Sequence, residues 1–222
     1  MDLWDKFWRP AAYTSVGFTL IAGFLGGILF WGGFHWSLEM TNTEEFCVSC
    51  HTMETNLGEY RDTIHYNNHS GVRAICSDCH VPNEWQHKVQ AKIVAVKDVY
   101  HELRGSIDTE EKYEEQRLHM ASLVWTKMKA TDSRECRNCH AFDYMDFTIQ
   151  ETRAANEHQR AIDGQMTCID CHQGIAHELP SGYMEEYQKI ARQFDGDTVG
   201  EANQNKAAQL SVKNTAVTST GQ

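Results

Sequence analysis

The chain has 222 residues, of which 41% are hydrophobic, and it carries a formal net charge of −11. An acidic chain of this kind repels anions and disfavours nucleic acid, and it could steer a partner with a basic patch, although a merely soluble surface explains the charge equally well. The mean hydropathy of −0.54 excludes a protein that is embedded in a membrane along most of its length.

The first element is an uncharged run of 24 residues, 11–34, long enough to cross a hydrocarbon layer about 30 Å thick. A cleaved secretory signal is the alternative, but its apolar core should span about 7–15 residues and end in a small-residue cleavage site. Aromatic residues typical of membrane interfaces flank the run: Trp4, Trp8, Tyr13, Trp31 and Trp36. We therefore expect residues 1–36 to form a cytoplasmic tip and an uncleaved transmembrane anchor.

Basic residues set the expected orientation of this anchor. Lys6 and Arg9 precede the run, whereas the first basic residue after it is Arg61. The positive-inside rule then places the amino terminus in the cytoplasm and everything after the single span in the periplasm of a bacterial inner membrane. Gly23-x-x-x-Gly27 permits close approach of a second helix, so a homodimer is an open alternative.

All eight cysteines belong to four copies of a Cys-x-x-Cys-His motif. The copies are Cys47-Val-Ser-Cys50-His51, Cys76-Ser-Asp-Cys79-His80, Cys136-Arg-Asn-Cys139-His140 and Cys168-Ile-Asp-Cys171-His172. In each copy two thiols can add to the vinyl groups of a haem, while the histidine ligates the iron. Zinc knuckles or disulfides would use the thiols but leave the histidines unexplained. The motifs therefore predict a tetrahaem c-type cytochrome.

The spacing of the motifs indicates a duplication. The first cysteines stand 89 residues apart (47 and 136) and 92 apart (76 and 168). We expect a dihaem half over residues 37–105, a second over 106–180, and a largely disordered polar tail over 181–222. The haems would supply much of the core, because a chain with few long apolar runs gains buried area from porphyrin faces. The haem-free chain should therefore fold poorly.

Helical periodicity gives a mostly α fold with no sustained β pattern. Apolar residues recur every three or four positions from Glu84 to about Arg104, and Gly105 ends that helix. A second helix should begin at Asp108-Thr109 and run to Ala130, since Asp108 has capping-box spacing to Glu111. A short amphipathic stretch follows over residues 183–194, and residues 195–222 read as disordered.

Several further segments carry a family resemblance. They are Thr43-Glu44-Glu45-Phe46, His65-Tyr66-Asn67-Asn68, Ser70-Gly71-Val72-Arg73-Ala74 and Cys168-Ile-Asp-Cys171-His172-x-Gly-Ile-Ala-His177-x-Leu-Pro180. With four motifs behind one amino-terminal span, residues 1–180 closely resemble the NapC/NirT family of membrane-anchored tetrahaem quinol dehydrogenases, most of all its NapC type. The resemblance implies four covalently bound haems and a quinol, ubiquinol or menaquinol, as substrate.

The resemblance also implies distal iron ligands, which the spacing alone does not assign among the eight histidines outside the motifs. His65, His158 and His177 match histidines that serve relatives as such ligands. We expect His65 to pair with the fourth haem, His158 with the third and His177 with the second. Together with the motif histidines His51, His80, His140 and His172, they would ligate the irons.

The first haem is expected to differ from the other three. Some relatives have a histidine where this chain has Asn83, and some use the methionine two places after the motif histidine, here Met53, as an iron ligand. Core filling is the alternative for Met53, and with His51 bound the opposite face of this haem could be vacant or held by water. Because this motif follows the span closely, its haem should lie where a lipid-borne quinol arrives.

Lys92 and Asp98 match residues that similar proteins place in a quinol pocket. On an ideal helix Lys92 points into the apolar stripe, where an unpaired ammonium is costly. Six residues put Asp98 about 120° around the helix from Lys92, so both can face one quinol only across a bend or a haem edge. Snorkelling of Lys92 along a haem or membrane surface is the alternative.

The resemblance implies a quinol dehydrogenase of anaerobic respiration that relays electrons to a periplasmic reductase or its cytochrome subunit, nitrate reductase being the commonest recipient in the family. A terminal reductase for nitrite or hydroxylamine at an open haem is a rival. The acidic domain, and the lack of a convergent Lys/Arg/Tyr set near a motif, count against it. A passive electron-storage cytochrome is the second rival.

Overall fold

The computed structural model describes residues 16–50 and 52–194 of the chain. Over these residues the protein is mostly helical and contains no strand, which confirms the expected α fold. The elements are α2 (Val16–Met40), α3 (Glu44–Cys47), α4 (Met53–Arg61), α5 (Cys76–His80), α6 (Trp85–Leu103), α7 (Glu110–Ala130), α8 (Arg134–Arg137), the 3₁₀ turn η1 (Phe142–Tyr144), α9 (Thr152–Ile162) and the 3₁₀ turn η2 (Cys168–Asp170).

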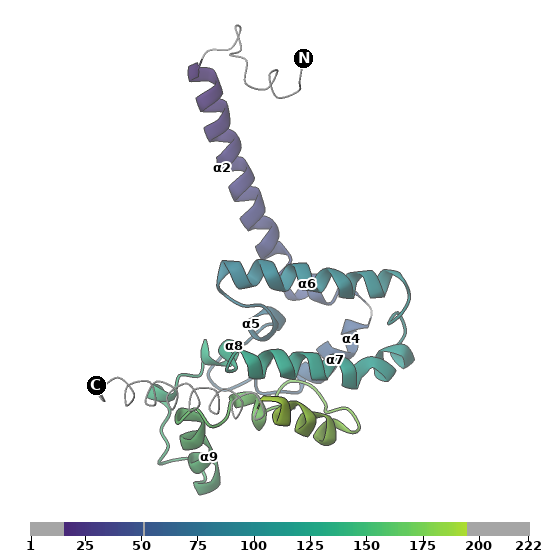
Figure 1. Cartoon of the computed structure of the whole chain (residues 1–222), viewed down its shortest axis with the longest axis vertical. Coiled ribbons are helices and arrows are strands. Elements are labelled where there is room, and N and C mark those ends of the chain that lie inside the picture. The colour runs from purple at the N-terminus through teal and green to yellow at the C-terminus, as the bar shows by residue number, and fades with distance from the viewer. Residues whose placement is uncertain (1–15, 51, 195–222) are drawn as a thin grey trace, which may run out of the picture.

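Helix α2 projects from the rest of the molecule as a single stalk (Figure 1). Its segment Gly17–Met40 is long and apolar enough to cross a membrane, and its most apolar stretch is not buried within the protein, although Leu38 near its end is. The helix continues six residues past Phe34, where the uncharged run ends. This extension is physically reasonable, because leaving the hydrocarbon layer does not interrupt backbone hydrogen bonding. Lys6 and Arg9, on which the expected orientation rests, lie outside the described residues.

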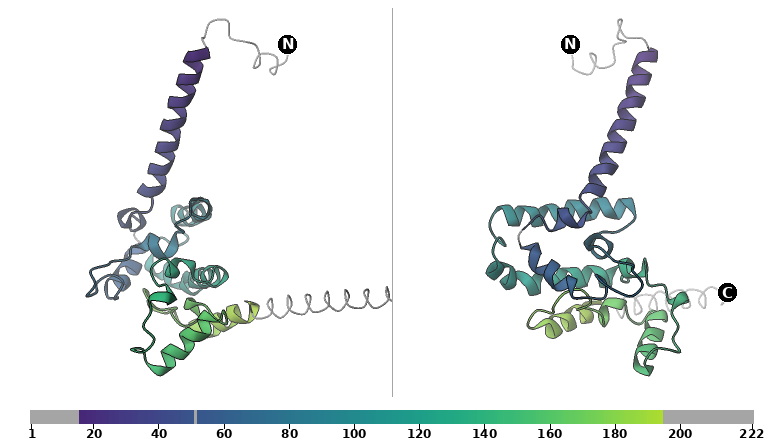
Figure 2. Two further views of the ribbon diagram at one scale, coloured as in Figure 1. Left: turned by 90° about the vertical axis from the view of Figure 1, so that its left-hand side faces the viewer. Right: turned by 180° about the vertical axis from the view of Figure 1, so that it is seen from behind.

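Helices α6 and α7 form the two long walls of the domain (Figures 1 and 2). Helix α6 ends before Gly105, whose φ of +71° suits a residue without a side chain. Helix α7 is capped by Thr109, whose hydroxyl accepts from the amide of Lys112 at 3.4 Å. The expected cap, Asp108, instead accepts from the Lys112 ammonium at 2.6 Å. The observed ends of both helices lie within two residues of the ends expected from the sequence.

The motif-bearing elements lie between and below these walls. Helix α6 crosses the lower end of α2, α7 runs roughly alongside α6, and α4 and α5 lie between the two (Figure 1). Helix α9 lies at the end of the domain that is farthest from α2 (Figures 1 and 2). The anchor therefore meets the domain at α6 and at the first two motifs.

Apolar packing is concentrated on one side of α7. Trp125, Ile169, Tyr187 and Ile190 are all buried there and form a single cluster. The last two belong to residues 183–194, which are helical. The packed domain therefore extends past residue 180, where we placed the end of the second half. Residues 195–222, expected to be disordered, lie outside the described part of the chain.

Candidate functional site

Each described motif begins in a short helical turn, which places its two cysteines close together on one side of the backbone. The second motif forms α5, the third runs out of α8 and the fourth forms η2. In the first motif Cys47 ends α3 and Cys50 follows it, while His51 lies outside the described residues. Two thiols one turn apart are what a double thioether link to one haem requires.

The second and fourth motifs share a local hydrogen-bond arrangement. The carboxylate of Asp78 accepts from the amide of Ile75 at 2.7 Å, and that of Asp170 accepts from the amide of Thr167 at 2.6 Å. Each aspartate thus satisfies an otherwise unpaired donor at the start of its motif turn. Glycines with φ near +72° precede both turns, Gly71 and Gly164.

Motifs of the same half lie side by side. The side chain of Cys47 lies next to that of Cys76, and the side chain of Cys136 lies next to that of Cys168. Helix α3 packs on α5, and α5 packs on α8, so contact also runs from one half to the other. This arrangement supports two closely spaced cofactors in each half and a continuous row through the domain.

Three pairs of histidine rings face one another at nearly the same separation. The ring centroids are 6.1 Å apart for His65 and His140, 6.3 Å for His80 and His177, and 6.3 Å for His158 and His172. A metal–imidazole bond of about 2.0 Å on each side, plus the two ring radii, separates such centroids by about 6 Å. The three pairs therefore fit bis-histidine ligation of an iron between the rings.

The pairing differs from our expectation in two of the three cases. His177 lies opposite His80, as expected for the second haem. His65, however, faces His140 of the third motif, and His158 faces His172 of the fourth, the reverse of what we predicted. Folding explains the exchange, because α9 carries His158 close to η2, while the loop after α4 carries His65 across to the third motif.

Burial keeps these imidazoles in the form that can bind iron. It lowers the pKa of His80 to about 4, with the neighbouring His177 as the second cause. Burial likewise lowers the pKa values of His65, His172 and His177. A neutral ring keeps a lone pair on nitrogen at neutral pH, as an axial ligand must.

Two of the ligand candidates have polar supports that sequence reasoning missed. The Nδ1 atom of His158 lies within hydrogen-bond distance of Oε1 of Gln150, at 2.7 Å. The Nδ1 atom of His177 lies 3.7 Å from Oε2 of Glu59, which is too far for a hydrogen bond but close enough for electrostatic interaction. Glu59 in turn binds the guanidinium of Arg117 at 2.5 Å. Such outer partners orient ligating histidines. No motif in the sequence points to them, since the contacts join distant parts of the chain.

The first motif has a methionine but no histidine pair among the described residues. Met53 begins α4, is half-buried, and its sulfur accepts from the Asn56 amide at 3.7 Å. Asn83, where some relatives have a histidine, is exposed and lines a cavity of about 290 Å³. Ligation by Met53 stays a prediction.

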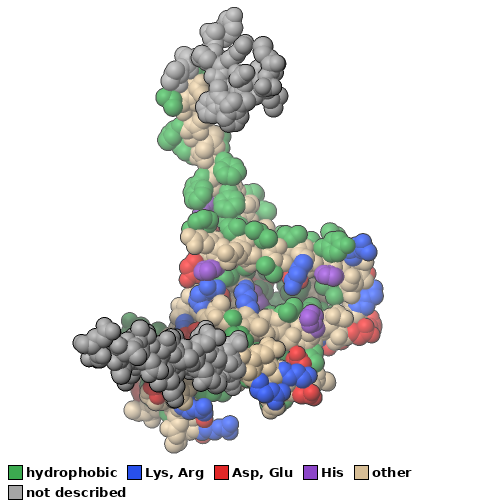
Figure 3. Space-filling model, in the orientation of Figure 1, with side chains coloured by type: hydrophobic (Ala, Val, Ile, Leu, Met, Phe, Trp, Pro, Cys, Tyr) green, Lys and Arg blue, Asp and Glu red, His purple; other side chains and the backbone are tan. Residues whose placement is uncertain are grey.

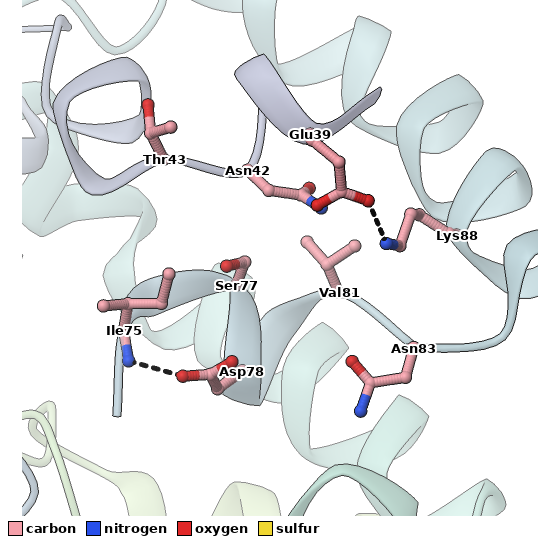
Figure 4. Close-up of a pocket in the computed structure, with 9 residues that line it drawn as sticks. All are labelled: Glu39, Asn42, Thr43, Ile75, Ser77, Asp78, Val81, Asn83 and Lys88. Atoms are coloured by element: carbon pink, nitrogen blue, oxygen red, sulfur yellow. Dashed lines mark hydrogen bonds and ion pairs between the residues drawn. The ribbon is translucent and has the colours of Figure 1, made fainter. Parts of the chain in front are cut away.

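This cavity lies where α2 ends, between α5 and the start of α6 (Figure 4). Glu39 and Lys88 meet at its edge, with Lys88 Nζ 2.7 Å from Oε1 of Glu39. Asn42 and Asp78 also line it. The sequence did not predict this cavity. The lysines at 88 and 92, one helical turn apart, were a signal that this face of α6 contacts another part of the protein.

The expected quinol-site residues both lie on α6 but have different surroundings. Lys92 is half-buried, and its ammonium donates to the carbonyl of Thr41, just beyond α2, at 2.5 Å. Burial lowers the pKa of Lys92. Asp98 is exposed. Neither residue lines the cavity, and the structure does not bring the two side chains together.

Comparison with known proteins is consistent along most of the chain. The model of the NapC/NirT cytochrome c family, N-terminal region, matches residues 9–182. Over 179 residues, 80% of this chain and 89% of each relative, the chain is 51% identical to the denitrification system component NirT of Stutzerimonas stutzeri and 52% identical to the cytochrome c-type protein NapC of Escherichia coli K12.

A third relative is named for its cofactor content. The chain is 50% identical to a putative tetraheme cytochrome c of Allochromatium vinosum over 176 residues, which are 78% of this chain and 96% of the relative. No solved structure matches the chain. The resemblance read from the motifs is thus confirmed by relatives of nearly the same length.

Proposed function

Because the chain belongs to the NapC/NirT cytochrome c family, we propose that it oxidises membrane quinol and delivers the electrons to a periplasmic terminal reductase. The protein is a membrane-anchored tetrahaem c-type cytochrome. We expect the recipient to be a nitrate reductase, in keeping with the NapC relatives, and the setting to be anaerobic respiration. The haem domain would then lie in the periplasm, with the amino terminus in the cytoplasm.

The observation that carries this proposal is the set of three histidine pairs in a domain whose first motif lies at the membrane end. The pairs support three irons that have both axial positions filled, which suits electron transfer rather than substrate binding. The first motif follows the end of α2. A series of haems whose irons have both axial positions filled, and which begins beside a membrane anchor, is suited to carry electrons away from a lipid-borne donor.

In this proposal the eight motif cysteines hold the haems. The four motif histidines and His65, His158 and His177 ligate the irons, and Met53 is a further ligand at the first haem. Those haems accept and pass single electrons. The remaining task for the protein is to receive the two protons of each quinol. Lys92 is suited to it, because burial lowers its pKa and so increases the fraction that can accept a proton.

The test replaces Lys92 by Gln and measures the rate of haem reduction by quinol in the membrane-embedded protein. We expect a loss of roughly tenfold or more, because a neutral amide cannot take a proton. Lys97→Gln is the matched control, since Lys97 is exposed on the same helix. Dithionite should reduce all four haems equally in both variants. An unchanged quinol rate in Lys92→Gln would remove Lys92 from the site.

A further inference from the structure

Helix α6 exposes seven large apolar side chains, each more than half accessible, and five of them lie on one side of the helix. These five are Trp85, Ile93, Val96, Tyr100 and Leu103, with exposed fractions of 54, 67, 64, 54 and 83%. On a helix that advances about 100° per residue, these five fall within an arc of about 80°. We call this set the apolar face of α6.

The rest of the helix surface carries protein contacts, polar groups and two further exposed apolar residues, Val94 and Val99. Lys88 and Lys92 bind Glu39 and Thr41 at the end of α2, and Glu102 accepts from the hydroxyl of Thr52 at 3.1 Å. A separate arc carries exposed polar side chains: Gln86, Gln90, Lys97, His101 and Arg104. The apolar face therefore lies between a face that is held by the protein and a face that suits water.

These contacts place α6 at a defined level. Because Lys88 and Lys92 bind the last residues of α2 and those just after it, α6 lies where the chain leaves the membrane. Glu102 holds the helix some 14 residues farther on, about 21 Å away. Figures 1 and 2 show α6 lying across the end of α2, with α5 and α7 on the side away from the stalk. Hydrophobic side chains follow the edge of α6 nearest to the stalk (Figure 3).

We propose that α6 lies in the membrane–water interface, with its apolar face against the lipid that α2 spans. The occupant is the bilayer itself, since the face continues the membrane contact of α2 and turns toward the same side. Trp85 and Tyr100 have the amphipathic rings that favour the headgroup region. A continuous apolar strip of this length is costly in water, and a helix with such a strip beside a polar arc suits an interfacial position.

Charge on α6 agrees with this placement. Arg104 follows the last turn of the helix and is exposed. Its guanidinium can extend toward phosphate headgroups while its stem stays in an apolar layer. The protein would then have two membrane contacts, one that spans the bilayer and one that lies on it. This inference depends on membrane anchoring and not on quinol oxidation.

The experiment compares two neighbouring positions of the holoprotein in phospholipid nanodiscs. Haem thioethers occupy the native cysteines, so Val96→Cys and Lys97→Cys each add one thiol that reacts. We expect a charged, water-soluble maleimide to modify Val96→Cys at least tenfold more slowly than Lys97→Cys. In wild-type protein, a phospholipid with a photoreactive acyl chain should form adducts within residues 85–103, found by mass spectrometry. Haem content of each variant reports folding.

Three results would overturn the proposal. The first is equal maleimide rates at the two positions, which would place the apolar face in water. The second is slow modification of Val96→Cys without a lipid adduct in residues 85–103, which would mean that a haem or a second copy of the chain covers the face. The third is a wild-type protein without lipid adducts on α6, and this result needs no variant.

Discussion

Arg117 joins three separate parts of the haem domain. It is 9% exposed and binds Glu59 of α4 at 2.5 Å, Glu114 of its own helix at 2.8 Å and the carbonyl of Glu178 at 2.8 Å. Although burial opposes it, hydrogen bonds to the two carboxylates raise the pKa of Arg117. Because the amide of Glu178 also donates to Glu59, this cluster fixes the backbone beside His177.

We predict that Arg117→Met lowers the free energy of unfolding by about 3–5 kcal/mol, because it leaves the carboxylate of Glu59 buried without its partner. Denaturant unfolding of the holoprotein, followed by circular dichroism, measures the change. Arg160→Met is the matched control, since the pair of Arg160 and Glu157 is largely exposed and should contribute less than about 1 kcal/mol. Equal losses of unfolding free energy in the two variants would show that the buried cluster stabilises the protein no more than an exposed ion pair does.

The motif residues illustrate what sequence can and cannot predict at this scale. The Cys-x-x-Cys-His pattern alone predicts that Cys76 and His80 belong to one haem site, because covalent attachment of a haem requires that spacing. The structure places each expected distal histidine opposite a motif histidine but exchanges the partners of His65 and His158, since no local pattern records which loop lies over which motif. Glu59 and Arg117 had no sequence signal, because their partnership exists only after folding.

At the scale of elements, the three histidine pairs differ in the angle between their rings. The planes meet at 77° for His65 and His140 but at only 19° for His158 and His172. Helix α9 and the loop after α4 set these orientations. Since axial ligand geometry is one of the levers by which a protein tunes a haem, the two irons should give distinct low-temperature EPR signals.

We predict that His65→Met and His140→Met alter the same EPR signal, because their rings face each other, and that His158→Met alters a different one. Replacing imidazole by thioether should also raise the potential of the affected haem. Spectra of these three purified variants and of His172→Met, each with four haems confirmed by mass, decide the pairing. If His65→Met and His172→Met changed one common signal, our original pairing would stand and the structural one would be wrong.

The predictability of helices followed the signals at their ends. Helices α6 and α7 were expected nearly at their observed ends, since a glycine ends α6 and a capping residue begins α7. Helix α9 was missed, because the segment Thr152–Ile162 has few large apolar residues and no strong cap. Its position is decided by tertiary contact, including the ring of His158 against His172.

For the whole molecule, the small apolar cluster beside α7 is the main packing that the described side chains provide by themselves. It holds α7, η2 and residues 183–194 together. Helices α4 and α5 bury little by comparison, each with one buried residue. Stability of the membrane-facing half must therefore depend strongly on the haems, which add apolar surface and tie loops to helices.

We predict that the haem-free chain, produced in cells unable to attach haem, loses cooperative thermal unfolding and much of its helical content. Circular dichroism in the same detergent as the holoprotein measures both. Hydrogen exchange should show the largest loss of protection at α4 and α5 and the smallest at α7 and residues 183–194, where side chains alone form a core. A haem-free chain with a sharp transition close to that of the holoprotein would contradict this view.

The histidines that reach across the domain have a consequence for the order of assembly. His65 of the first half faces the third motif, and His177 of the second half faces the second motif. Each half thus lends a ligand to the other, so neither is complete when cut from its neighbour. If the domain is exported as proposed, a chain that leaves its translocation pore amino end first exposes residue 80 long before residue 177. The second haem would then lack its distal ligand until about four fifths of the chain had crossed the membrane.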